Sequence, residues 1–326
     1  RFARAALQLA QSQHCQIIHA HSPARIFKAA DRVAKACRLP VVYEARGMQE
    51  ATAVAESRVA ANDPLIRRWR DAETQAMKQA QHVIVLGEAM RAEVMARGIS
   101  GDKITVVANG CNPAAPIDDS TVAVEIASRF LQQNGALAVG LVGSIQRLEG
   151  VLELIEAVAH LKHSGVPVRL LLVGSTRIES ELKAVIQERL LGDDVLLMDA
   201  VSPAEALAIL NLLDVTVVAR QESFVSRLVT PLKPLDAMSQ GCCVVMSDFP
   251  ASREIILPGK TGCLVDPNDS NSLVDTIRNL AADRSLCSRL GVAGQKWAQT
   301  ERTWAQGAAI VKNVYMATLN CDGQMR

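Results

Sequence analysis

The chain of 326 residues is long enough for two α/β domains, and its 35 basic side chains almost balance its 34 acidic ones. This balance argues against a dedicated nucleic-acid-binding protein, which would carry a clear excess of positive charge. Hydrophobic residues make up 49% of the chain but aromatic residues only 3%, a composition typical of helices and parallel strands built from small aliphatic side chains.

The eight cysteines include no Cys-x-x-Cys pair, and three of them lie in or beside apolar runs. They indicate reduced, buried thiols rather than disulfides or a zinc site, and we expect no metal site. No apolar run approaches the ~18–20 residues that a membrane span needs, and no signal peptide is recognisable. We therefore expect a cytoplasmic protein. The chain begins at Arg1 within an apparent helix, which predicts an N-terminal truncation.

Strand-like and helical segments alternate along the chain, and this rhythm predicts doubly wound parallel sheets. In the first part we expect strands at 16–20, 40–43, 82–86 and 103–107, and helices at 24–38, 64–79 and 88–97. Turn-forming residues and prolines then interrupt the rhythm over residues 113–120. In the second part we expect strands at 137–142, 168–173, 195–198, 215–218 and 242–246, and helices at 151–162, 179–190, 203–212 and 272–282.

The pattern therefore predicts two Rossmann-like domains, over residues 1–115 and 116–300. The segment from about 286 to 319 is expected to be helical. We expect its C-terminal part, residues 301–326, to pack back on the first domain.

A loop with two prolines and a helix opening precede the last expected strand. Thr230 is a good N-cap and Pro231 a good first helical residue, although Pro234 is an alternative marker of the first turn. A helix N-terminus beside Lys233 attracts phosphate, and Asp236, three residues further on, suits a ribose diol. These residues predict a site for a nucleotide-sugar, and a capped helix that binds nothing is the alternative.

Two glycine-containing loops also follow expected strands. Gly143-Ser144, closed by Gly150, follows one strand, and Gly174 follows the next. Neither loop has a dinucleotide or Walker fingerprint. Both lie at the carboxyl ends of parallel strands, where open α/β sheets bind ligands, so together they support a phosphate site.

Two groups of arginines suit anionic partners. Arg220 and Arg227, with Glu222 between them, precede the helix opening, and their guanidiniums suit a diphosphate leaving group. Solvated loop charges are the alternative. The basic cluster 67–70, which surrounds a tryptophan, fits either a peripheral membrane contact or a solvated helix face.

In the first domain, His19 and His21 follow a strand, and an imidazole there suits a phosphate or a sugar hydroxyl. Glu44 and Arg46 leave the next strand. A hydrogen-bonded loop histidine and a structural ion pair are the respective alternatives.

In order and spacing, these motifs resemble the retaining glycosyltransferases of the GT-B fold, family 4 (group 1), and in particular the bacterial branch that assembles polysaccharides. The matching stretches extend over nearly the whole chain. They are residues 17–21, 40–47, 83–86, 97–98, 103–110, 140–150, 171–174, 229–241, 247–248, 253–254 and 261–262.

The resemblance implies a second domain that holds a nucleotide-diphosphate sugar and a first domain that holds a glycan or lipid-linked acceptor, facing each other across a cleft. It implies a retaining hexosyltransferase of surface polysaccharide assembly that needs no metal or cofactor and works in the cytoplasm or peripherally at the inner membrane face. The implied catalytic residues are His21, Lys233 and Asp236. The implied donor-binding residues are Gly143, Ser144, Arg147, Gly174, Arg220, Arg227, Thr230, Lys233 and Asp236, and the acceptor-side residues are His19, Glu44 and Arg46.

The chain departs from the family pattern in three places. The family commonly has two glutamates eight positions apart, where this chain has Leu228 and Asp236. Glu149 stands in a loop where many members place basic residues, and a glutamate there cannot bind phosphate directly. The family's first strand and its glycine-rich acceptor loop have no counterpart before Arg1. A degenerate nucleotide-sugar-binding protein and a nucleotide-sugar epimerase of the same fold are therefore alternatives.

Overall fold

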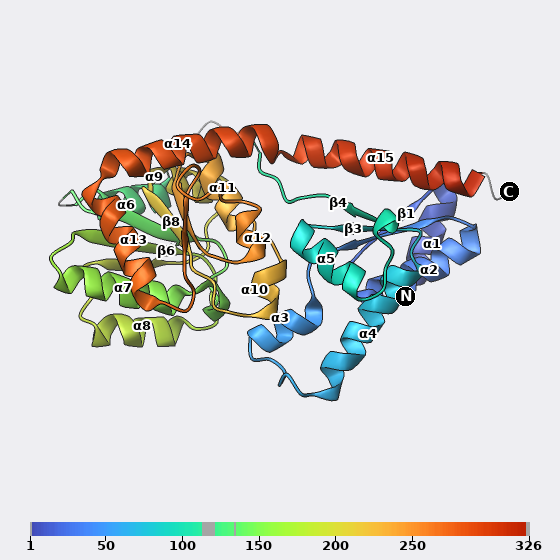
Figure 1. Cartoon of the computed structure of the whole chain (residues 1–326), viewed down its shortest axis with the longest axis horizontal. Coiled ribbons are helices and arrows are strands. Elements are labelled where there is room, and N and C mark those ends of the chain that lie inside the picture. Colours follow the sequence, from blue (N-terminus) through green and yellow to red (C-terminus); the bar gives the residue numbers. More distant parts are fainter. Residues whose placement is uncertain (1, 113–120, 134, 324–326) are drawn as a thin grey trace. The chain divides into compact units, whose positions relative to one another are not determined.

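The computed structural model describes residues 2–112, 121–133 and 135–323, which form two α/β units (Figure 1). Unit 1 comprises Arg1–Asn109, Ser223–Thr230 and Trp304–Arg326, and unit 2 comprises Gly110–Glu222 and Pro231–Thr303. Each unit is built on a parallel sheet with helices on it, so the prediction of two Rossmann-like domains is confirmed. The predicted linker at 113–120 lies outside the described residues.

Unit 1 has a four-stranded sheet in the order β1-β2-β3-β4, in which all neighbours are parallel. The strands are β1 (Ile18–His21), β2 (Val41–Ala45), β3 (His82–Val85) and β4 (Ile104–Val106). The helices are α1 (Phe2–Ser12), α2 (Ala24–Cys37), α3 (Gln49–Ala55), α4 (Pro64–Gln79), α5 (Glu88–Ala96), the 3-10 turn η1 (Gly101–Lys103), α10 (Phe224–Leu228) and α15 (Trp304–Gly323).

The helices of unit 1 begin and pack for identifiable reasons. Asp63 caps α4 by accepting a hydrogen bond from the Leu65 amide at 2.8 Å, and Pro64 occupies the first turn, where its missing N–H costs nothing. Helix α15 lies along the sheet (Figure 1), with Val314 buried against Val42 and Ile84. The sheet of unit 1 is therefore completed by a helix from the far end of the chain.

Unit 2 has a six-stranded parallel sheet in the order β10-β9-β8-β5-β6-β7. Every residue of β5 and β6 is buried, as expected for a parallel sheet with helices on both faces. The strands are β5 (Leu137–Val142), β6 (Val168–Val173), β7 (Val195–Met198), β8 (Val215–Val218), β9 (Cys243–Ser247) and β10 (Cys263–Val265). The helices are α6 (Val122–Leu131), η2 (Arg147–Glu149), α7 (Val151–His163), α8 (Glu179–Glu188), α9 (Pro203–Leu212), α11 (Lys233–Ser239), α12 (Pro250–Arg253), α13 (Ser270–Ala282) and α14 (Arg284–Glu301).

The structure adds elements that the sequence pattern does not predict, namely α3, α6, α10, α12 and β10. It also divides the helix expected over 286–319 into α14 and α15. The break lies at Arg302, whose carbonyl accepts a hydrogen bond from the Cys111 amide at 2.7 Å, while Cys111 and Thr303 form a parallel bridge. Within residues 2–112, 121–133 and 135–323, no helix has the length and apolar character to cross a membrane.

Candidate functional site

In unit 2, the loops that leave β5 and β6 touch each other through glycine backbone. Gly143 and Gly174 have φ of +118° and +144°, which side chains rarely tolerate. A Cβ on Gly174 would lie 1.8 Å from the carbonyl oxygen of Gly143, and the Gly143 amide donates to the Val173 carbonyl at 2.8 Å. The two predicted glycines therefore bring bare backbone together at the carboxyl edge of the sheet, where α/β folds bind ligands.

Lys233 extends over this backbone. It is the first residue of α11, and a Cβ on Gly143 would lie 3.2 Å from its Cε atom. Its side chain is 20% exposed. Glycine at position 143 thus leaves room for the lysine stem, and the structure brings together Gly143, Gly174 and Lys233 as the sequence predicts.

Glu149 joins Lys233 to Arg220. One carboxylate oxygen of Glu149 lies 3.1 Å from a terminal nitrogen of Arg220, and the other lies 3.5 Å from Nζ of Lys233. The next residue, Gly150, has φ of +72°, and a Cβ there would lie 1.8 Å from the carbonyl oxygen of Ala219. The segment that carries Glu149 therefore packs tightly against the segment that carries Arg220.

The surroundings of this cluster lower the pKa of Glu149 and the pKa of Lys233. Burial disfavours the charged form of Glu149, but Arg220 and Lys233 outweigh it and hold its pKa below the ordinary value. Burial lowers the pKa of Lys233, and Glu149 limits that decrease. In the sequence, Glu149 is recognisable only as a departure from the family pattern, whereas the structure gives it the central place in the cluster.

The remaining predicted donor residues of unit 2 lie at its surface. Ser144 is exposed and accepts a hydrogen bond from Gln146 at 3.1 Å. Arg147 is ion-paired with Glu181 of α8 at 2.6 Å. Asp236 is exposed on α11, and among the described residues its carboxylate has no hydrogen-bond or ion-pair partner. Its carboxylate is thus accessible to a ligand.

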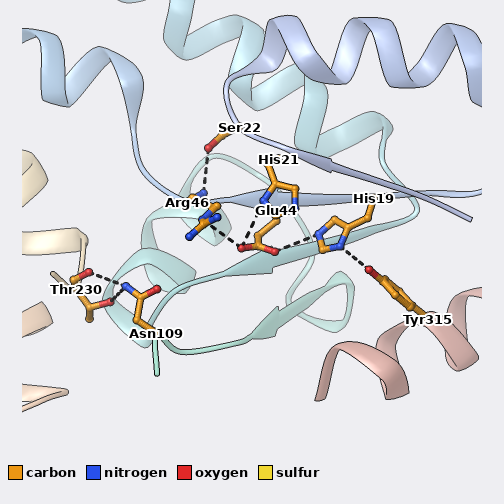
Figure 2. Close-up of polar contacts among 8 residues, drawn as sticks. All are labelled: His19, His21, Ser22, Glu44, Arg46, Asn109, Thr230 and Tyr315. Carbon is orange, nitrogen blue, oxygen red and sulfur yellow. Dashed lines mark hydrogen bonds and ion pairs between the residues drawn. The ribbon is translucent and has the colours of Figure 1, made fainter. Parts of the chain in front are cut away.

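The predicted role of Thr230 as an N-cap is wrong. Helix α11 begins at Lys233 after Leu232, and Pro234, the alternative marker, lies in its first turn. Thr230 is buried in unit 1, where its carbonyl accepts from Nδ2 of Asn109 at 2.9 Å (Figure 2). This tertiary contact, rather than the helix, uses the polar groups of Thr230.

Arg227 also belongs to unit 1, where it lies exposed in α10. Arg220 belongs to unit 2, so the two arginines expected to act together are carried by different units. The structure therefore assigns only Arg220 to the Lys233 cluster.

The predicted acceptor-side residues gather at the ends of β1 and β2 in unit 1 (Figure 2). His21 pairs with Glu44 in the register of the two strands, and His19 is two residues before His21, so all three share one face of the sheet. Nε2 of His19 lies 3.2 Å from Glu44, and Nδ1 of His21 lies 3.9 Å from the same carboxylate. The imidazole rings stack with centroids 4.7 Å apart.

Tyr315 of α15 completes this cluster, with its hydroxyl 2.6 Å from Nδ1 of His19 (Figure 2). A neutral His19 ring that carries its proton on Nε2, toward the Glu44 carboxylate, can accept from the Tyr315 hydroxyl through Nδ1. Tyr315 is not among the predicted site residues, although it lies in the C-terminal segment that is expected to pack on the first domain.

Arg46 follows β2 and lies 3.6 Å from Glu44 through its Nε atom, so the ion pair given above as the alternative is present. Its amide donates to Ser22 Oγ at 3.1 Å (Figure 2). Burial lowers the pKa of His21, which favours a neutral imidazole there. The result is a carboxylate surrounded by groups that are able to donate hydrogen bonds.

The histidine pair and Glu44 also have the donor set of a metal site. Their ligand atoms all lie within 4.8 Å of one another, and the set is unique in that respect among the described residues. Within unit 1, Nδ1 of His19 lies 2.6 Å from the Tyr315 hydroxyl, and Nε2 lies 3.2 Å from the Glu44 carboxylate. The cluster is thus a network of polar contacts between β1, β2 and α15.

A cavity of about 490 Å³ in unit 2 opens between α7 and α13. Of the predicted donor-binding residues, all of which the structure describes, Arg220 alone lines it. The cavity thus lies beside the Lys233 cluster rather than over it.

Comparisons with known proteins bear on both units. Residues 126–297 match the family model of the glycosyl transferases group 1, and residues 1–115 match that of glycosyltransferase family 4. The α-maltose-1-phosphate synthase of Mycolicibacterium smegmatis is 28% identical over 268 residues, which are 74% of this chain and 65% of the synthase. The capsular polysaccharide biosynthesis glycosyltransferase CapM of Staphylococcus aureus is 23% identical over 227 residues, which are 68% of this chain and 57% of CapM.

The structure also resembles that of Anabaena HepE in complex with UDP-glucose. The TM-score is 0.75 at 18% identity, over 97% of this chain and 82% of HepE. This likeness shows a shared fold. The chain spans less than two thirds of the two curated relatives named above.

Proposed function

Because the chain belongs to the group 1 glycosyltransferases, we propose that it transfers a sugar from a nucleotide-diphosphate donor to an acceptor hydroxyl with retention of configuration. The observation that carries this proposal is the position of Lys233, whose stem covers Gly143 at the carboxyl edge of the unit 2 sheet. An ammonium group beside half-buried glycine backbone, which has no side chain to block a ligand, suits a diphosphate. Asp236, exposed one turn along α11, suits the ribose diol of the same donor.

In the proposed reaction, the bond between the sugar C1 and the phosphate oxygen breaks, and both electrons remain on the oxygen. The acceptor hydroxyl attacks C1 from the same face, and its proton passes to that oxygen. Lys233 and Arg220 stabilise the negative charge that develops on the leaving diphosphate. These two cations take the part that a metal ion plays in other transferases, so we propose a reaction that needs no metal.

We assign the acceptor side to unit 1. His21 would lie near the transferred sugar, with Glu44 holding its ring in place. A glycan or lipid-linked acceptor, as in surface polysaccharide assembly, fits the similarity to CapM. The exposed Arg67 and Arg68 of α4 suit a peripheral contact with an anionic membrane that carries such an acceptor.

The test is donor binding and hydrolysis by the whole chain with UDP-glucose and GDP-mannose. We expect Lys233→Ala to weaken binding of the donor by about 10- to 100-fold, because a charged hydrogen bond to phosphate is lost. Lys183→Ala is the matched control, since Lys183 is an exposed lysine of the same unit that pairs with Glu179. It should leave both binding and hydrolysis unchanged.

The alternatives give different results. Binding of UDP or GDP that depends on Lys233, without any turnover, indicates the degenerate binding protein. Conversion of the free nucleotide-sugar into its epimer, without an acceptor, indicates the epimerase. Binding that Lys233→Ala does not change contradicts the assignment of the donor site.

A further inference from the structure

Glu149 is a buried carboxylate that two cations share. Its side chain is 6% exposed, whereas those of Arg220 and Lys233 are 13% and 20% exposed. The Glu149 side chain is therefore less accessible to solvent than the side chains of the two cations. Each cation faces a different oxygen of Glu149, so the carboxylate bridges them.

The backbone holds this carboxylate in place. The amide of Gln221 donates to the carbonyl of Leu148 at 3.1 Å, which ties the Glu149 segment to the Arg220 segment. Ser247 Oγ donates to the carbonyl of Arg220 at 2.7 Å. A side chain at position 150 would collide with Ala219. The spacing between Glu149 and Arg220 is thus built into the fold.

We propose that Glu149 is a positioning residue for donor binding, which holds the ammonium of Lys233 and the guanidinium of Arg220 side by side at the diphosphate site. The proposal rests on the proposed function. Lys233 has three N–H donors, so its contact with Glu149 leaves donors for a ligand. Without the carboxylate, the two half-buried cations would repel each other and separate.

A positioning role for Glu149 predicts a change in affinity opposite to the one that charge alone predicts. Removing the negative charge of Glu149 makes the site more positive, so charge counting predicts tighter binding of a diphosphate. If Glu149 holds the cations in place, its removal weakens binding instead. The sign of the change in affinity therefore separates the two accounts.

A second readout is the pH dependence of binding. The groups that face Lys233 are Glu149 from η2, Arg220 from the loop after β8, and Asp236 from its own helix. Burial and Arg220 lower the pKa of Lys233, and Glu149 and Asp236 raise it. Loss of Glu149 therefore shifts deprotonation of Lys233 to lower pH, and binding is lost at lower pH than in the wild type.

The experiment measures the affinity of the whole chain for UDP and for GDP by calorimetry from pH 6 to pH 10. We expect Glu149→Gln to bind about 10- to 100-fold more weakly at pH 8 and to lose binding at lower pH than the wild type. Glu149→Asp keeps the charge and should restore the wild-type pH dependence, with a smaller loss of affinity. Glu156→Gln is the matched control, because Glu156 pairs with Arg189 at 2.9 Å outside the site.

The possible outcomes distinguish failure of the role of Glu149 from failure of the proposed function. Affinity of Glu149→Gln that equals or exceeds the wild type at every pH overturns the proposal. If Glu149→Gln does not fold, Glu149→Asp is measured instead. An affinity of Glu149→Asp that equals the wild-type affinity at every pH then overturns the proposal. If neither UDP nor GDP binds the wild type, or if Lys233→Ala binds as well as the wild type, the proposed function fails. If Lys233→Ala loses binding while Glu149→Gln does not, only the role of Glu149 fails.

Discussion

Replacing Gly174 by alanine tests whether the close contact of the two glycine loops is real. A Cβ at this position would lie 1.8 Å from the carbonyl oxygen of Gly143, whereas real Cβ atoms essentially never approach within 3.0 Å. The loops must therefore separate by at least 1.2 Å, the difference between these two values. The backbone at Gly174 also has φ of +144°, which alanine rarely adopts.

The expected loss of stability follows from two contributions. An unfavourable φ costs about 1–3 kcal/mol. Separation of the loops breaks the hydrogen bond from Gly143 to Val173, and a buried unsatisfied group costs about 1–3 kcal/mol. We therefore expect Gly174→Ala to lower the free energy of unfolding by about 2–6 kcal/mol. The displaced Gly143 also moves away from the stem of Lys233, so UDP binding should weaken as well.

Two other glycines supply controls within the same unit. Gly165 has φ of +72° and no atom within 4 Å of the place that a Cβ would take, so alanine there measures the cost of φ alone, about 1–2 kcal/mol. Gly192 has free space and no positive φ, so alanine there should be neutral or stabilise by up to about 1 kcal/mol. Urea denaturation followed by circular dichroism gives the ranking. If Gly174→Ala unfolds at the same urea concentration as Gly192→Ala, the close contact is refuted.

Three further predictions concern buried polar groups. Arg97→Ala removes the 2.8 Å partner of buried Glu50, so we expect a loss of about 3–5 kcal/mol in urea denaturation, and a loss under 1 kcal/mol would contradict the buried pair. Tyr315→Phe removes the hydroxyl at His19 and should cost about 0.5–1.5 kcal/mol, measured in the same way. Glu149 has a lowered pKa in the folded protein, so its stabilising contribution is complete above its unfolded pKa of about 4.3 and is lost as pH falls through the folded pKa. When the pH is lowered from about 6 to about 3, the urea concentration at the midpoint of unfolding should therefore decrease more steeply in the wild type than in Glu149→Gln. Equal decreases in the two proteins would contradict this.

The sequence predicts those elements of the fold whose local pattern agrees with their burial. Strands 137–142 and 168–173 have the predicted bounds because every residue in them is buried and nearly all are apolar. Helix α4 begins at the predicted residue because Asp63 and Pro64 form a local start signal. Helix α10 and strand β10 have five and three residues, so neither is long enough for a period to show.

The candidate site residues also divide into those with a local sequence signal and those that only tertiary contacts reveal. Gly143, Gly174 and Lys233 could be predicted because local sequence signals indicate them. The two glycines follow apolar strands, and Lys233 lies beside the residues that begin a helix. Thr230 has the local signature of a cap, but its partner Asn109 is 121 residues away and only the tertiary fold reveals it. The contacts of Glu149 with Lys233 and Arg220 are also long-range, so the sequence shows an unusual residue without showing what it contacts.

The connectivity of the two units has a consequence for synthesis on the ribosome. The chain passes between the units at 109–110, 222–223, 230–231 and 303–304, so unit 1 is assembled from three separate segments. The sheet of unit 1 is translated before Val314, which packs on Val42 and Ile84 and follows them by about two hundred residues or more. Unit 2 has all its residues once position 303 has left the exit tunnel. We therefore expect unit 2 to complete its fold before unit 1, the reverse of the usual order in which the N-terminal domain folds first.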